Sequence, residues 1–349
     1  MSEPLDFRLN CPLPNDIHAT VQMAHGGGGR AMRNLIESMF RPAFGAQAGP
    51  AHDSAVLAVP EGRLAFTTDT FVVSPLFFPG GDIGKLAVCG SVNDLAMAGA
   101  KPAWLSAAFI LEEGFSLESL ARIVASMRRT ADEAGAVIVT GDTKVVDRGK
   151  GDGLFINTAG IGTIPPFFDI SPARVKPGDA ILVSGDLGRH GVAILSVREG
   201  LTFEGALESD CAPLNGLVEA LTPLGPSLHC LRDLTRGGLA SALNEIALDA
   251  NVGIAVDEVA VPVEPAVTGA CELLGLDPLY VANEGRMVAF VAAEAADQAI
   301  EIMRAHPAAV GPARIGAVVA HHPGTVELRS AFGGRILDLL SGEQMPRIC

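Results

Sequence analysis

Five apolar segments in the first half of the chain predict β-strands. They are rich in Val, Ile, Leu and Ala, and turn residues separate them. A proline and a glycine stand between the first two segments, which predicts a hairpin. The predicted strands cover residues 53–59, 62–73, 102–112, 136–146 and 155–164.

Helical periodicity appears between these strands. Residues 84–98 predict a helix that ends at Gly99, and residues 117–134 predict a second helix that ends at Gly135. Ser116 and Ser119 are the candidate N-caps of the second helix. A further helical pattern directly follows the glycine run "HGGGG" at 25–29 and stops at a proline.

A proline-rich segment, residues 163–179, is the best boundary between two domains. Beyond it, strands and helices alternate again, which predicts a mixed α/β (α+β) fold with two domains. Residues 180–200 are expected to start a second α/β unit. Strands are expected at 253–259, 286–292, 311–320 and 324–330, and helices at 234–251, at 264–278 and after residue 292. The predicted divisions are a lead-in (1–24), two α/β domains (25–165 and 175–335) and a flexible tail (336–349).

Composition excludes several classes of protein. Apolar residues make up 48% of the chain with only one Trp and one Tyr, so the cores must be aliphatic. The net charge of −15 and the lack of a basic run argue against nucleic-acid binding. No apolar run is long enough for a bilayer and the first ten residues are polar, so we expect a cytoplasmic protein without a membrane anchor.

The six cysteines do not have the spacing of a zinc site. Four of them lie in or beside apolar runs and are expected to be core thiols: Cys89, Cys211, Cys230 and Cys271. The last residue, Cys349, is different, because an exposed thiol is prone to oxidation. It is either incidental, as terminal residues commonly are, or the working part of the chain.

Aspartates inside apolar segments are the most informative feature of the first half. Burying an uncompensated carboxylate is costly, so their co-occurrence suggests a site for Mg²⁺ carried by nucleotide phosphates. Lys144 could neutralise a transferring phosphoryl group, and the glycine run at 25–29 could bind an anion. Taken singly, Asp53 and Asp142 are better explained as turn or cap residues, and Asn93 with Asp94 fits a polar helix face. The four aspartates are Asp53, Asp69, Asp94 and Asp142.

The second half has two charged sequences among glycines. One contains Asp233 and Arg236, and the other contains Glu284 before Gly285. A glutamate close to an apolar strand is a candidate base with a raised pKa, although a surface turn explains it about as well. His190 and His229 are interpreted as structural.

Several motifs together resemble one known family. They are "TTDTFVVSPLFFPGGDIGKLAVCGSVNDLAMAGAKP", "GDTKVV", "RDLTRGGLASALNE", "ELLGLDPLYVANEG" and the terminal "PRIC". In this order they are similar to the hydrogenase maturation factor HypE family of carbamoyl dehydratases. That family belongs to the aminoimidazole ribonucleotide synthetase-like ATP-binding superfamily. Two positions depart from the usual pattern: Leu234 replaces a proline and Ser91 replaces a threonine.

The resemblance implies a fold, an activity and ligands. It implies a two-domain fold whose N-terminal sheets pair across a homodimer, and ATP with Mg²⁺ as ligands. The implied reaction is ATP-dependent dehydration of a thiocarboxamide on Cys349 to a thiocyanate, with Lys144 and Glu284 acting around the phosphorylated intermediate. The implied nucleotide-binding residues are Asp53, Asp69, Asn93, Asp94, Gly141, Asp142 and Thr143, and the four aspartates among them would bind the metal.

The resemblance also implies partners. The carbamoyltransferase HypF would load Cys349, and a HypC–HypD complex would receive the cyanide destined for the iron of a [NiFe] hydrogenase. The seven residues that follow Gly342, up to Cys349, could span roughly 25 Å at about 3.3–3.6 Å each. A small-molecule kinase or synthetase of the same superfamily is the alternative, and a metal-carrier protein with Cys349 as a soft ligand is a third.

Overall fold

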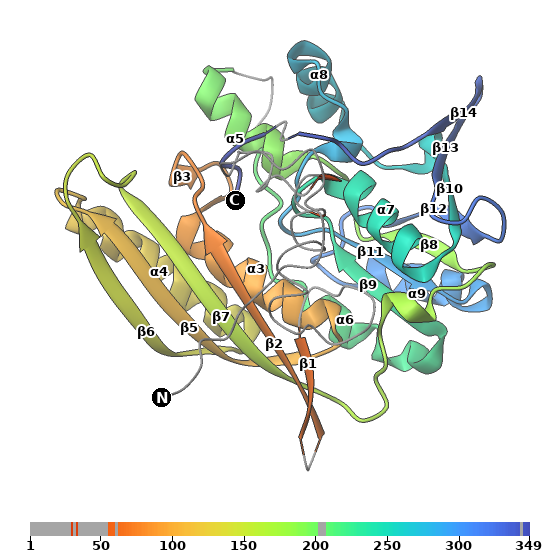
Figure 1. The fold of residues 1–349 in the computed structure, drawn as a ribbon, viewed down its shortest axis with the longest axis horizontal. Helices are drawn as coiled ribbons and strands as arrows, with labels where there is room; N and C mark the ends of the chain where they lie inside the picture. The colour runs from red at the N-terminus through yellow and green to blue at the C-terminus, as the bar shows by residue number, and fades with distance from the viewer. Residues whose placement is uncertain (1–28, 31–32, 34–54, 60–61, 202–206, 343–344) are drawn as a thin grey trace, which may run out of the picture.

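The computed structural model describes residues 29–30, 33, 55–59, 62–201, 207–342 and 345–349. Within its elements, positions 55–59, 117–118, 140 and 142–145 are described by their backbone alone. These residues form a mixed α/β structure with two main sheets, which lie side by side in Figure 1. The predicted lead-in, the glycine run at 25–29 apart from Gly29, and Asp53 lie outside the described residues.

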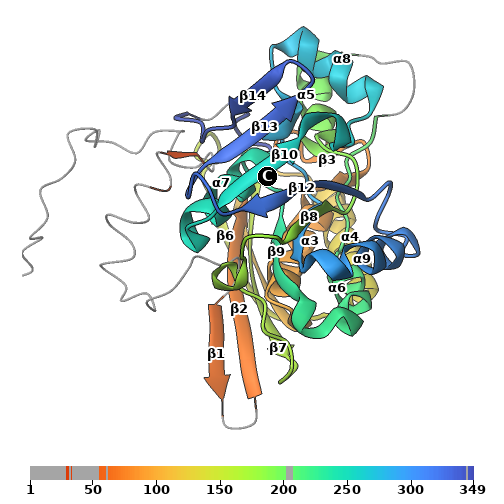
Figure 2. The same cartoon turned by 90° about the vertical axis from the view of Figure 1, so that its right-hand side faces the viewer.

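The first sheet has five strands in the order β1-β2-β7-β5-β6. Its pairs are antiparallel except for β5 and β6, which are parallel. Hairpin β1–β2 extends away from the second sheet (Figure 2). The strands are β1 (Ala55–Val59), β2 (Gly62–Phe71), β5 (Lys101–Glu112), β6 (Val137–Val146) and β7 (Leu154–Ile164). A short hairpin, β3 (Phe77–Phe78) and β4 (Gly81–Asp82), leads into the first helix.

Two helices cover one face of this sheet, α3 (Ile83–Met97) and α4 (Leu117–Ala134) (Figure 1). Asp82 caps α3, and Ser116 caps α4 by accepting a hydrogen bond from the backbone N–H of Ser119. Gly135 ends α4 in the left-handed conformation, where glycine is favoured. The opposite face of the sheet, here called the outer face, exposes large apolar side chains: Phe66, Trp104, Ile110, Val137 and Val139.

The second sheet has seven strands in the order β14-β13-β10-β12-β8-β11-β9. Side chains of β8 alternate between two cores, since Ala180 and Leu182 pack with α6 and α9, and Ile181 and Val183 pack with α7. The strands are β8 (Ala180–Val183), β9 (Leu228–Asp233), β10 (Gly253–Asp257), β11 (Met287–Val291), β12 (Ala313–Val319), β13 (Val326–Ser330) and β14 (Gly333–Ile336). The helices are α5 (Arg189–Glu199), α6 (Asn215–Ala220), α7 (Gly238–Ala250), α8 (Pro265–Leu274) and α9 (Ala296–Arg304).

Helix α3 lies between the two domains. It packs against β2 and β7 of the first sheet, and against α6 and β9 of the second domain. Thirteen of its fifteen residues are buried, so it is apolar on every side, as expected for a helix enclosed by protein. Asp94 is one of the two residues that are not fully buried. The helix therefore presents one carboxylate at the junction of the domains.

The predicted strands and helices of both domains are confirmed within the described residues. The patterns did not predict β9, α6 or β14. The expected core cysteines Cys89, Cys211, Cys230 and Cys271 are buried. Among the described residues, no helix is long and apolar enough to cross a membrane.

Candidate functional site

A cavity of about 270 Å³ collects most of the predicted site residues that the structure describes with side chains. Residues from β2, α3, β9 and the sequence before β11 form its walls, and the last residue of the chain closes it. The lining residues are Thr68, Asp69, Thr70, Phe71, Gly90, Asp94, Asp233, Thr235, Arg236, Glu284 and Cys349. Four carboxylates and one thiol from distant parts of the sequence thus share one polar cavity.

Hydroxyl groups orient the two aspartates of the first domain. Thr67 donates a hydrogen bond of 2.6 Å to Asp94, and Ser91 donates one of 3.3 Å to Asp69. Ser91 also lies 2.7 Å from the Thr158 hydroxyl, so the serine at this position keeps the hydroxyl contact of the usual threonine. Burial raises the pKa of Asp69, while Arg236, Ser91 and Asp94 act to lower it.

The carboxylates of the second domain are more deeply buried. Burial is the main cause that raises the pKa of Asp233 from 3.8 to about 6, and the neighbouring Asp69 adds to it. Burial also raises the pKa of Glu284 well above its ordinary value, with further contributions from Cys211 and Asp233. The Oε1 atom of Glu284 has no hydrogen-bond partner in the structure. A buried carboxylate with a high pKa and an unused oxygen is suited to accept a proton.

The amide of Asn93 is occupied by the backbone of the second domain. Its Oδ1 accepts a 2.7 Å hydrogen bond from the N–H of Leu214, and its Nδ2 donates to the carbonyls of Ala212 and Glu284. The structure therefore places Asn93 beside the site as a link between domains, and a contact with nucleotide stays a prediction.

The last five residues of the chain pack into a groove beside α5. The N–H of Val72 donates to the carbonyl of Cys349 at 3.1 Å, and the N–H of Ser74 donates to the carbonyl of Arg347 at 3.2 Å. Both donors belong to the segment that directly follows β2. Met345 and Ile348 are buried in the core that includes residues of both domains. The tail thus holds Cys349 at the cavity.

Two side chains of α5 bind the tail through its backbone. His190 lies with Nε2 2.9 Å from the carbonyl oxygen of Ile348. Arg198 donates to the carbonyls of Pro346 and Arg347, and also to that of Ser74. The Arg347 side chain pairs with Asp152 and donates to the Val72 carbonyl. Most of these hydrogen bonds use main-chain atoms of the tail, and the buried side chains of Met345 and Ile348 add apolar contacts.

Positions 141–144 are not next to Asp69 within one chain. Asp69 is in register with Thr158, Ala107 and Gly141, whereas Thr70 is in register with Asn157, Ala108 and Asp142. Position 144 pairs with Ile110, which is exposed on the outer face. Strand β6 is three strands from β2, roughly 14 Å at about 4.8 Å per strand. Positions 142 and 144 thus belong to the other face of the sheet.

The sequence patterns noted Asp233 without assigning it a role, and did not single out Asp210. Asp233 ends β9, and its position at a strand end before "TRGG" was the available signal. Asp210 is buried and accepts hydrogen bonds from the N–H groups of Glu284 and Gly285. No local pattern indicates this contact, because it joins residues far apart in the sequence.

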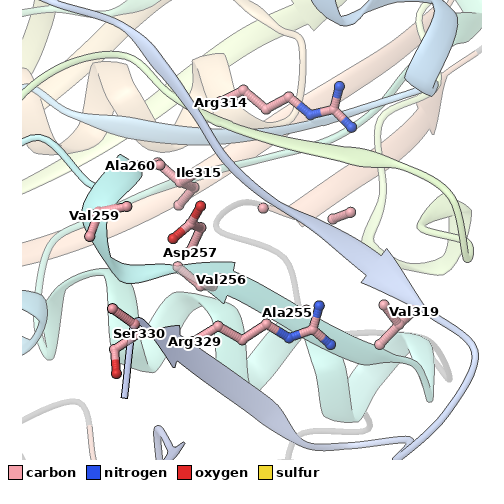
Figure 3. Close-up of a pocket in the computed structure, with 13 residues that line it drawn as sticks. Ala255, Val256, Asp257, Val259, Ala260, Arg314, Ile315, Val319, Arg329 and Ser330 are labelled. Atoms are coloured by element: carbon pink, nitrogen blue, oxygen red, sulfur yellow. The ribbon is translucent and has the colours of Figure 1, made fainter. Parts of the chain in front are cut away.

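A larger cavity of about 620 Å³ lies on the second sheet (Figure 3). Residues of β10, β12 and β13 line it, and the side chains of Arg314 and Arg329 lie on opposite sides of Asp257 in the view. Arg329 is already paired with Glu327. The cavity brings together an apolar floor and a few surface charges, without the buried acids found beside Cys349.

Comparison with known proteins first defines the class. Residues 51–164 match the model of the N-terminal domain of AIR synthase related proteins, and residues 176–329 match the model of the C-terminal domain. The fold is therefore the two-domain AIR synthase-like fold.

Individual relatives then define the family. The chain is 55% identical over 333 residues to carbamoyl dehydratase HypE of Rhodobacter capsulatus, covering 94% of this chain and 98% of that protein. A solved HypE–HypF complex contains a chain that matches with a TM-score of 0.83 and 48% identity, and the match covers 88% of this chain and 99% of that chain. A HypE structure in complex with ATP matches with a TM-score of 0.80 and 48% identity, and the match covers 95% of this chain and 100% of that chain. The chain belongs to the carbamoyl dehydratase HypE family.

Proposed function

We propose that the chain dehydrates a thiocarboxamide on Cys349 to a thiocyanate at the expense of ATP, and so supplies cyanide for hydrogenase maturation. The observation that supports this most strongly is the position of Cys349, which lines the same cavity as Asp69, Asp94, Asp233 and Glu284. A small-molecule kinase of the same superfamily would not need a thiol beside the carboxylates of its active site. The names of the relatives support the same reaction.

The reaction needs a better leaving group than the amide oxygen. Phosphoryl transfer from ATP to the oxygen of Cys349–S–C(=O)–NH₂ converts that oxygen into part of a phosphate. Loss of the phosphate and of both N–H protons leaves Cys349–S–C≡N, ADP and inorganic phosphate. Glu284 is placed to accept a proton, since its Oε1 is unpaired and burial raises its pKa. The low polarity of the surroundings keeps this carboxylate basic once it is ionised.

Hard oxygen ligands at the cavity fit Mg²⁺ in their chemistry. Among the described residues, no three His, Cys, Asp or Glu side chains are arranged to hold a metal ion by themselves. We infer that Asp69 and Asp94 would share the ion with phosphate oxygens, and with Asp53 or Asp142. The bound ion would offset the charge of the transferring phosphoryl group.

A homodimer would complete the site. The outer face exposes Trp104, Ile110 and Val139, which a second sheet could bury. Positions 142 and 144 share this face by register, position 143 lies between them on the same strand, and all three are far from Asp69 in their own chain. We infer that the outer faces of two subunits pack together, so that Asp142, Thr143 and Lys144 of one subunit serve the cavity of the other.

We infer that the tail leaves its docked position for carbamoylation, because Cys349 is half-buried at the cavity and its donor is another enzyme. We infer that HypF is this donor, as the HypE–HypF complex of a relative suggests. After dehydration, a HypC–HypD complex would take the cyanide. The flexible tail predicted for residues 336–349 fits this cycle if the docked tail is one of two positions.

Intact mass spectrometry tests the reaction. The protein is incubated with HypF, carbamoyl phosphate, ATP and Mg²⁺, beside a Cys349→Ser variant. The wild-type chain should gain one carbamoyl group and then lose one water, and the variant should do neither. If the wild type stays unmodified while HypF is active on a known substrate, the proposed function is wrong.

A further inference from the structure

Residues 209–212, here called the bracket, connect with the docked tail through His190 and bond directly to the peptide of Glu284. On the tail side, the hydroxyl of Ser209 lies 2.8 Å from Nδ1 of His190, whose Nε2 faces the carbonyl of Ile348. On the other side, the carboxylate of Asp210 accepts hydrogen bonds of 3.2 Å from the N–H of Glu284 and 3.0 Å from that of Gly285. Four residues therefore connect the thiol-bearing tail with the predicted base.

The direction of each hydrogen bond in the bracket can be assigned. The carbonyl of Ile348 can only accept, so Nε2 of His190 carries the proton. Burial lowers the pKa of His190, so the ring is neutral at neutral pH and Nδ1 accepts from the Ser209 hydroxyl. The oxygen of Ser209 in turn accepts the N–H of Cys211 at 3.1 Å. The chain of donors and acceptors leaves none of these groups unpaired.

The bracket is held closely on both sides. The residues Ser209, Asp210 and Cys211 are buried. A Cβ atom on Gly285 would lie 1.9 Å from the carbonyl oxygen of Asp210, so only glycine allows this approach. A further hydrogen bond of 3.3 Å runs from the N–H of Ala212 to the carbonyl of Glu284. A segment packed this tightly transmits displacement, since close-packed interiors have little free space.

We propose that the bracket couples docking of the tail to the placement of Glu284, and that His190 and Asp210 are positioning residues for the dehydration step. The inference rests on the proposed function for its catalytic meaning. When the tail is docked, His190 fixes Ser209, and the bracket then holds the peptide of Glu284 in place. When the tail leaves, the same contacts loosen, so the base is aligned only while Cys349 is in the cavity.

The first test needs neither ATP nor a carbamoyl donor. The full-length protein is alkylated with iodoacetamide, and modification of Cys349 is followed by mass spectrometry of the terminal peptide. His190→Asn keeps an acceptor for Ser209 but removes the donor to Ile348, and should speed alkylation about three- to tenfold. His190→Gln keeps a donor near the Nε2 position and should restore much of the protection.

Asp210→Asn is the decisive variant, because the hydrogen bonds of the Asp210 carboxylate go to Glu284 and Gly285, and its change acts on the Glu284 side. The coupling predicts that alkylation of Cys349 is again about three- to tenfold faster. An unchanged rate in a folded Asp210→Asn protein would overturn the proposal. If Asp210→Asn does not fold, Asp210→Ser makes the same test, since it also removes the carboxylate that accepts from Glu284 and Gly285.

Double variants separate coupling from general loosening. Asp152→Asn is the matched control, because it weakens the tail through Arg347 and does not touch the bracket. The effects of His190→Asn and Asp210→Asn on alkylation should combine to clearly less than their product. Those of Asp152→Asn and Asp210→Asn should multiply to within about twofold. Multiplicative behaviour in both pairs would contradict the coupling.

A second readout concerns the reaction itself. On carbamoylated protein in a single turnover, His190→Asn should slow dehydration about three- to tenfold at saturating ATP, with the KM for ATP unchanged. A merely structural defect would change both. If the alkylation rates show the coupling but the wild-type protein does not dehydrate its thiocarboxamide, the structural role of the bracket is supported and the proposed function is wrong. Normal dehydration by a His190→Asn protein would overturn its positioning role.

Discussion

The amide of Asn93 on α3 donates a hydrogen bond of 3.3 Å to the carbonyl oxygen of Glu284. The two residues are 191 positions apart in the sequence and belong to different domains. Asn93 is almost completely buried, and its remaining bonds are to Ala212 and Leu214. The peptide of Glu284, the proposed base, is thus held from two directions, by Asp210 at its N–H and by Asn93 at its carbonyl.

Asn93→Ala should lower the free energy of unfolding by on the order of 2–4 kcal/mol, because it leaves several buried backbone groups without partners. Asn93→Asp should be at least as harmful, since a carboxylate would face two carbonyl oxygens. Urea denaturation measures both effects. A nucleotide-binding role alone would give the opposite pattern, with weaker ATP binding and unchanged unfolding.

Asp233→Asn should stabilise the protein at neutral pH and not at pH 4. The folded protein holds a proton on Asp233 up to about pH 6, whereas the unfolded chain releases it near 3.8. The stability from this group is complete below pH 4 and is lost as the pH rises through 6. The Asn side chain does not lose a proton in this range. As the pH rises, the free energy of unfolding of the variant should therefore exceed that of the wild type by on the order of 1–3 kcal/mol.

Urea denaturation of both proteins at pH 4, 5, 6 and 7 checks the expectation for Asp233. Asp69 and Glu284 also have raised pKa values and interact with Asp233, so the difference between the curves reports the titration of Asp233 together with its coupling to these two carboxylates. A difference that stays constant over this range would contradict the raised pKa of Asp233.

Mixing of two inactive variants tests whether the site is shared between subunits. Lys144→Ala should lose dehydration and still accept the carbamoyl group, and Glu284→Gln should do the same. If one subunit supplies Lys144 to the Glu284 of the other, a mixed dimer has one complete site. After unfolding and joint refolding, activity should return to roughly a quarter of the wild-type value, since half of the dimers are mixed. No recovery would place Lys144 and Glu284 in the same chain's site.

Trp104→Asp should convert the proposed dimer to a monomer. The side chain is 49% exposed on the outer face, so the change should have little effect on the folded subunit itself. A buried charge at a dimer interface, by contrast, is strongly unfavourable. Light scattering after gel filtration measures the mass. Arg128→Asp, on the exposed surface of α4, is the control that should leave the mass unchanged.

Local signals were sufficient for much of the fold. The Ser116 cap and Gly135 end of α4 were predictable, because caps depend on neighbouring residues. Strand β9 was not, since His229 and Arg232 interrupt its apolar pattern, and His229 is accommodated only through its contact with Asp179. Strand β14 has no buried residue in its pattern and therefore no hydrophobic signal.

The site was predictable to the extent that residue type indicates chemistry. Asp69, Asp94, Glu284 and Cys349 lie at one cavity, as the motifs implied together. The predicted metal site of four aspartates stays a prediction, because Asp53 lies outside the described residues, and strand order and register put position 142 on the other face of the sheet from Asp69. Register depends on contacts between distant segments, and a sequence pattern does not contain them.

The enclosure of α3 has a consequence for how the molecule melts. Two separate clusters of core residues each combine side chains of the first domain with side chains of the second, and α3 contributes to both. Detaching either domain would expose a helix that is apolar on every side. The two domains should therefore unfold together in one cooperative transition, and neither should be obtainable as a separate stable fragment.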